Sequence, residues 1–80
     1  MQLDILTPEK KIFSGEASSV SLYGTEGHFQ VLNHHAPLIS SLKAGEIKYR
    51  TSSGETRLMA KEGFVEVLNN KVTVLVEGVE

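Results

Sequence analysis

One stretch of the sequence decides the fold: Gly24-Thr25-Glu26-Gly27-His28-Phe29-Gln30-Val31-Leu32-Asn33-His34-His35-Ala36-Pro37-Leu38. Its two glycines can adopt positive φ without steric cost, so they predict a sharp turn. Phe29 and Val31 alternate with polar residues, which is typical of a half-buried strand. Pro37 fixes its own φ and favours extended backbone at Ala36, so we expect an ordered loop that holds His35.

Short segments of alternating polarity fill the rest of the chain, and turn residues separate them. We expect strands over residues 2–6, 11–16, 17–23, 46–50, 57–60, 64–68 and 71–77. Residues 38–42 could also form a helical turn, but Gly45 leaves too little length for a stable helix, so a strand is expected. Gly15 predicts a bulge or a bend between sheets. Asn69-Asn70 predicts a two-residue hairpin, because Asn tolerates left-handed backbone.

The spacing of these strands predicts the fold class. Nine to ten short strands, separated by turns and unaccompanied by a convincing helix, indicate an all-β protein. We expect a flattened sandwich of two antiparallel sheets. The 80 residues suffice for one domain, so we expect a single domain over residues 1–80.

The pattern G-T-E-G-x-F-x-V-L-x-x-H-A-P-L also resembles the signature of a known family, the epsilon subunit of the F-type ATP synthase, in its N-terminal β-sandwich domain. The resemblance continues on both sides, through Thr7-Pro8, Phe13-Ser14-Gly15, Leu42-Lys43-Ala44-Gly45, Gly63-Phe64-Val65-Glu66-Val67 and Lys71-Val72-Thr73-Val74-Leu75. It implies a non-catalytic rotor subunit of the central stalk, which couples rotation of the proton-driven c-ring to the gamma subunit. It also implies a peripheral position on the cytoplasmic face of a bacterial inner membrane, or the equivalent organelle face.

Members of this family usually carry a pair of helices after the sandwich. The family uses these helices to restrain ATP hydrolysis and, in some members, to bind ATP. The sequence ends at Glu80, where the helices would begin, and both a naturally short form and a shortened one fit it. No inhibitory role and no nucleotide ligand are therefore expected.

Composition argues against several classes of function. The chain has no cysteine, and its eight basic and ten acidic residues are scattered. Nucleic-acid binding needs clustered cations, so it is not expected. No apolar run reaches the length of a membrane-spanning helix, so we expect no direct membrane insertion, only contact through a protein partner.

Side chains that could support chemistry do not form a convincing site. His34 and His35 are sequential, so in extended backbone they point to opposite sides, and a metal ion would need His28 and Glu26 brought close as well. No serine lies in a nucleophile elbow, and the phosphate-binding loop motif is absent. We therefore expect no enzyme activity, no metal and no cofactor. The alternative is a free-standing small β-domain that binds a sugar or a metal ion.

Two loops and one apolar strip are the candidate binding surfaces. By resemblance, Glu26, Gly27 and His28 belong to the turn that meets the polar loops of the c-ring. His35, Ala36 and Pro37, with the adjacent strand faces, belong near the gamma subunit. Both loops flank one strand, so we expect them at its opposite ends. Separately, Leu68 and Leu75 lie off the main core face and could form an exposed apolar strip; burial by the opposing sheet is the alternative.

The chain departs from the family pattern at three positions. The residue after Gly27 is commonly acidic in the family and is His28 here. The family often has Pro-Gly before H-A-P, whereas this chain has Asn33-His34, so its loop must be shaped without that glycine. Glu62 takes the first place of a frequent Gly-Gly turn. Each change alters the charge or shape of a candidate surface.

Overall fold

The computed structural model describes all residues from 1 to 80, and they form nine strands without a helix. The strands are β1 (Gln2–Leu6), β2 (Lys11–Glu16), β3 (Ser19–Gly24), β4 (Gly27–Leu32), β5 (Leu38–Leu42), β6 (Gly45–Thr51), β7 (Gly54–Ala60), β8 (Gly63–Leu68) and β9 (Lys71–Val76). The all-β expectation is confirmed, including the strand over residues 38–42.

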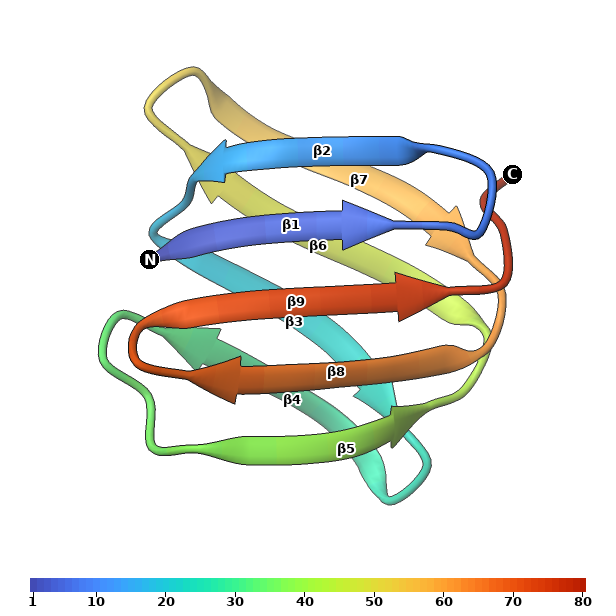
Figure 1. Ribbon diagram of the computed structural model, residues 1–80. Coiled ribbons are helices and arrows are strands. Elements are labelled where there is room, and N and C mark those ends of the chain that lie inside the picture. The colour runs from blue at the N-terminus through green and yellow to red at the C-terminus, as the bar shows by residue number, and fades with distance from the viewer.

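The strands form two layers (Figure 1). The front layer has the order β2-β1-β9-β8-β5, and the back layer has the order β7-β6-β3-β4. One pairing, between Gly24 and Leu42, joins β3 to β5 along one edge, so the hydrogen-bonded sheet curls around into the second layer. The expected sandwich is therefore confirmed.

One pairing departs from the antiparallel expectation. β1 and β9 run parallel, with Leu3 opposite Val72 and Ile5 opposite Val74. These strands lie at the two ends of the sequence, so no short turn constrains their relative direction. A pattern of alternation within each strand cannot reveal such a long-range pairing.

A single cluster of 16 buried residues fills the space between the layers. Val72, Val74 and Val76 all point into it, as their alternation predicts. Thr73 and Leu75 therefore face outward from the front layer.

Gly15 marks neither the predicted bulge nor a bend between sheets, because it lies within β2 in regular pairing with Leu3 of β1. The irregularity lies two residues earlier along the pairing, where Ile5 faces Phe13 but Leu6 faces Lys11, which leaves Ile12 as the extra residue. Gly15 instead makes room for an aromatic ring, because a Cβ there would lie 3.2 Å from the Phe13 side chain. The ring of Phe13 in turn packs on Tyr49, with centroids 4.5 Å apart.

The turns follow the predicted residues with one change. Asn69 and Asn70 both have positive φ, 52° and 59°, so the expected hairpin turn is confirmed. Gly27 has a φ of 134°, whereas Gly24 does not have positive φ. Gly24 is needed for close packing instead, since a Cβ would lie 3.0 Å from the Phe29 ring.

Candidate partner-binding surfaces

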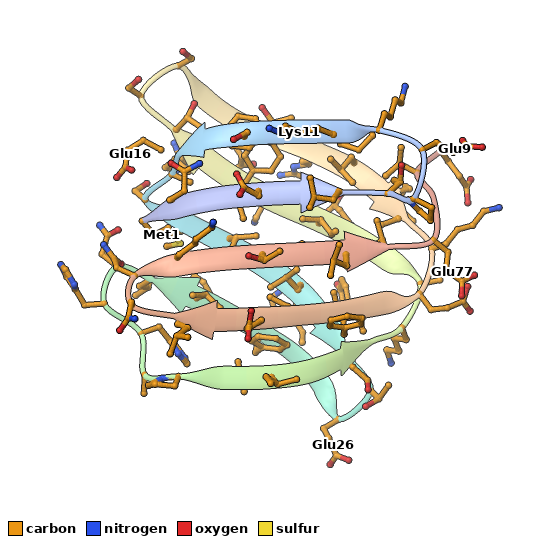
Figure 2. The ribbon with its side chains drawn as sticks, viewed as in Figure 1. Met1, Glu9, Lys11, Glu16, Glu26 and Glu77 are labelled. Carbon is orange, nitrogen blue, oxygen red and sulfur yellow. The ribbon has the colours of Figure 1, made fainter.

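The turn between β3 and β4 projects from one edge of the sandwich, and Figure 2 places Glu26 at its tip. The side chains of Glu26 and His28 are exposed. Tyr23 lies opposite His28 across the two strands, and the two rings pack with centroids 4.8 Å apart. The turn therefore presents a carboxylate next to a pair of aromatic rings.

The loop between β4 and β5 is held by backbone and side-chain hydrogen bonds. The amide of His35 donates to the carbonyl of Leu32 at 3.2 Å, and the His35 Nδ1 lies 2.7 Å from the carbonyl oxygen of Ala36. Ala36 and Pro37 are exposed. The predicted ordered loop around His35 is thus present.

His34 has left-handed backbone, with a φ of 63°. The condition of extended backbone, on which the argument against joint metal binding by His34 and His35 depended, is therefore not met at this histidine. Left-handed conformation is uncommon for residues other than glycine, although histidine is enriched among the exceptions. The amide of His34 donates to the Oδ1 of Asn70 at 2.8 Å. The β8–β9 hairpin therefore helps to shape the loop that lacks a glycine.

The two loops lie at opposite ends of β4, as expected from their order in the sequence. A six-residue strand spans about 20 Å. One compact partner element would therefore not cover both loops, and we treat them as separate surfaces.

Leu68 and Leu75 share the outer side of the front layer, which we name the hollowed face. It consists of the outward side chains Leu6, Ile39, Phe64, Leu68 and Leu75 with the polar residues between them. Leu68 is 48% exposed and Leu75 is half-buried, so the opposing sheet does not cover this face. The alternative of burial by that sheet was therefore wrong.

Sequence reasoning missed two outward residues of the same face. Ile39 is 73% exposed on β5, and Phe64 is 47% exposed on β8. Four of the five residues from Phe64 to Leu68 are apolar, and only Glu66, which shares the parity of Phe64 and Leu68, marks the outer side. The pairing of Phe64 with the outward Leu75 agrees.

A hollow of about 410 Å³ lies at the end of this face where β1 and β9 finish and β8 begins. Its lining includes Thr7, Pro8, Phe64 and Leu75, and the two carboxylates Glu62 and Glu77 stand beside them. Figure 2 places Glu77 at this end of the molecule.

The middle of the hollowed face is polar. The Asp4 carboxylate accepts hydrogen bonds from the Ser14 hydroxyl at 2.7 Å and from the Gln2 amide at 3.0 Å, and Lys71 lies 3.8 Å away. The Ser14 bond is the largest cause that lowers the pKa of Asp4, followed by the bond from Gln2. Asp4 is thus held ionised in a local network.

The outer side of the back layer, which we name the charged face, differs in its ion pairs. Glu55 lies 3.0 Å from both Arg50 and Arg57, and Arg57 also approaches Glu46 at 3.9 Å. The hydrogen bond from Arg57 is the main cause that lowers the pKa of Glu55. Tyr23, Leu32 and Met59 are the exposed large apolar side chains here.

Two further observations bear on possible ligands. No group of three or more His, Asp or Glu side chains is placed to hold a metal ion. The molecule has no helix that could cross a membrane.

Comparison with known proteins defines the family. The family model described as the ATP synthase delta/epsilon chain β-sandwich domain matches residues 1–80. An ATP synthase epsilon chain of Geobacter sulfurreducens is 44% identical over 80 residues, which are all of this chain and 58% of that relative. One from Chlorobium limicola is 43% identical over 79 residues, which are 90% of its own length.

A structural comparison agrees with the sequence match. A chain in the Tetrahymena thermophila mitochondrial ATP synthase central stalk and c-ring structure superposes with a TM-score of 0.86 at 17% identity. The match covers 99% of this chain and 64% of that one, and it concerns the fold alone. The chain spans little more than half the length of several relatives. Its 80 residues match the β-sandwich domain throughout, and the chain therefore belongs to the ATP synthase delta/epsilon chain family.

Proposed function

We propose that residues 1–80 act as one rigid rotor element of a proton-translocating F-type ATP synthase, coupling c-ring rotation to the gamma subunit without catalysis of their own. The observation that carries this proposal is the hollowed face, which leaves Ile39, Phe64 and Leu68 exposed in a chain matched along its whole length to the family. Exposed apolar side chains gathered on one face mark an interaction surface.

The architecture suits the transmission of torque. A closely packed interior is nearly incompressible, so a load applied to one face reaches the other. Here 39 of the 49 backbone hydrogen bonds lie within the strands and tie them into one sheet. Rigidity, rather than chemistry, is the property that the role requires.

The hollowed face and the turn between β3 and β4 are separate surfaces, and they suit two different partners. We assign the gamma subunit to the hollowed face, with Leu68, Leu75 and the loop of His35, Ala36 and Pro37 at its border. We assign the polar loops of the c-ring to the turn of Glu26, Gly27 and His28. The assembly would lie at the energy-coupling membrane, on the cytoplasmic face of a bacterial inner membrane or the equivalent organelle face. No nucleotide is needed for this role.

A free-standing sugar- or metal-binding domain is not favoured. Sugar recognition by stacking needs aromatic side chains gathered on the surface. Tyr49 is buried, Phe13 and Phe29 pack against the core, and the exposed Tyr23 and Phe64 lie on opposite layers.

Co-purification with the cognate gamma subunit tests the proposal. We expect a 1:1 complex in size-exclusion chromatography at micromolar concentration. A chain that stays wholly monomeric in the presence of folded gamma subunit would refute the rotor assignment.

The c-ring surface needs its own test. Glu26→Lys should weaken retention of the gamma complex on purified c-rings several-fold, because it reverses the charge at the tip of the turn. Glu9→Lys, which makes the same charge change outside that turn, is the matched control. Equal retention of both variants would contradict the assignment of Glu26 to the ring.

A further inference from the structure

We infer that the hollow at the end of β1, β8 and β9 receives an apolar side chain flanked by a lysine or arginine of a partner protein, and that Glu62 selects this cation. The inference rests on the proposed function, in which the partner is the gamma subunit. It adds to that function a defined contact and the residue that determines its specificity.

Strand register brings together an apolar row on the hollowed face, and two of its members, Phe64 and Leu75, line the hollow. Leu6 pairs with Leu75 across β1 and β9, and Leu75 pairs with Phe64 across β9 and β8. These three outward side chains thus form one continuous row, and Thr7 and Pro8 stand at the end of β1 as a wall. Because Phe64 remains 47% exposed, the row offers apolar area that the chain itself does not cover.

A backbone hydrogen bond places Glu62 and Glu77 next to each other at the border of this row. The amide of Glu77 donates to the carbonyl of Glu62 at 3.0 Å, so the two residues are neighbours. Both side chains are exposed, and neither has an ion-pair partner within the chain. No lysine or arginine lines the hollow.

Glu62 is the more isolated of the two carboxylates. Glu77 also lines a neighbouring hollow that contains Lys10 and Lys61, so cations stand on its other side. Glu62, in contrast, lines the apolar hollow and not the neighbouring one. Its charge is therefore the one best placed for a cation from outside the chain.

This charge pattern decides between possible occupants. A second copy of the chain, docked symmetrically, would place like carboxylates against each other, and an anionic lipid surface would also be repelled. A protein segment with an apolar side chain next to a lysine or arginine fits this pattern. The apolar side chain would pack on the row, and the cation would pair with a carboxylate at the border.

Isothermal titration of the chain with its cognate gamma subunit tests the inference. We expect Phe64→Ser and Glu62→Lys each to weaken the affinity by about tenfold or more, since one removes the apolar contact and the other opposes the cation. Glu62→Gly should weaken it about threefold and reduce its dependence on salt concentration. Glu16→Lys, which reverses an exposed carboxylate at the opposite end of the molecule (Figure 2), should stay within about twofold of wild type.

The outcomes separate the inference from the function beneath it. If the wild-type chain binds the gamma subunit and neither Glu62→Lys nor Phe64→Ser changes the affinity, the hollow is not the contact site, and the rotor assignment is kept. Absence of wild-type binding would overturn both. A dimer of the isolated chain that Phe64→Ser dissociates would assign the hollow to a second copy and overturn the inference. Thermal melting of each variant checks that it is folded.

Discussion

The two outer faces of the sandwich differ in how their charges and apolar side chains are satisfied. On the charged face, Glu55 forms ion pairs with Arg50 and with Arg57, each at 3.0 Å. On the hollowed face, the carboxylates of Glu62 and Glu77 have no such partner, and they border an apolar hollow. The Glu55 ion pairs of the charged face are made within the chain, whereas Glu62 and Glu77 on the hollowed face can gain such partners only from another molecule. The difference teaches that unpaired charge beside exposed apolar area is a better sign of an interface than charge alone.

The largest effect should come from Gly63, which forms part of the lining of the hollow. A Cβ at this position would lie 1.9 Å from the carbonyl oxygen of Leu75, so Gly63→Ala must displace backbone where β8 meets β9. We expect a loss of about 3 kcal/mol or more in the free energy of unfolding, measured by urea denaturation.

Gly78→Ala is the matched control at the same end of the molecule. Its Cβ would meet only the Lys61 side chain at 3.5 Å, so we expect a change within about 0.5 kcal/mol. Similar losses for both variants would show that the close packing of β8 on β9 does not define the hollow.

Asp4 should show a smaller, pH-dependent effect on the hollowed face. Asp4→Asn removes the ionised acceptor for Ser14 and Gln2, and we expect a loss of about 1 kcal/mol or less at pH 7. Because the fold lowers the pKa of Asp4 below its ordinary 3.8, this stability is present above that value and is lost as the pH falls through the folded-state pKa. Unfolding curves for wild type and variant should therefore converge in acid. A constant difference between pH 7 and pH 2 would contradict the account.

His34→Gly should stabilise the protein slightly. The left-handed φ of 63° strains a histidine but not a glycine, and the greater freedom of glycine in the unfolded chain offsets part of the gain. We expect about 0.5 kcal/mol of added stability in thermal or urea unfolding. His35→Gly is the control and should destabilise, because His35 has no positive φ. A destabilising His34→Gly would mean that the His34 side chain supports the loop.

The smallest effect should come from the charged face. Glu55→Gln breaks two exposed ion pairs, and exposed pairs contribute little to stability. We expect a change in melting temperature smaller than that of Asp4→Asn, together with unchanged affinity for the gamma subunit. A marked loss of affinity would show that the gamma subunit binds the charged face, and it would contradict the assignment of this partner to the hollowed face.

Much of the fold could be read from local sequence patterns. Alternation placed Val72, Val74 and Val76 in the core, and Asn69-Asn70 identified the hairpin, because these signals depend on neighbouring residues. The parallel pairing of β1 with β9 and the irregularity at Ile12 depend on contacts between distant segments, so local patterns did not reveal them.

The candidate surfaces were predictable to a lesser degree. Leu68 was singled out because it lies off the core-facing alternation, and it is exposed. Phe64 was missed although it shares the parity of Leu68, because Glu66 is the one polar residue that marks the outer side of this apolar strand. The hollow needs Phe64 and Leu75 side by side from two strands, and only their register brings them together.

Hydroxyl-radical footprinting of the chain with and without its cognate gamma subunit tests the central claim most directly. Four side chains of similar exposure report on the two faces: Phe64 at 47% and Leu68 at 48% on the hollowed face, and Tyr23 at 39% and Met59 at 48% on the charged face. We predict that gamma protects Phe64 and Leu68 from oxidation and leaves Tyr23 and Met59 reactive. Protection of Tyr23 and Met59 with Phe64 and Leu68 still reactive would contradict the account.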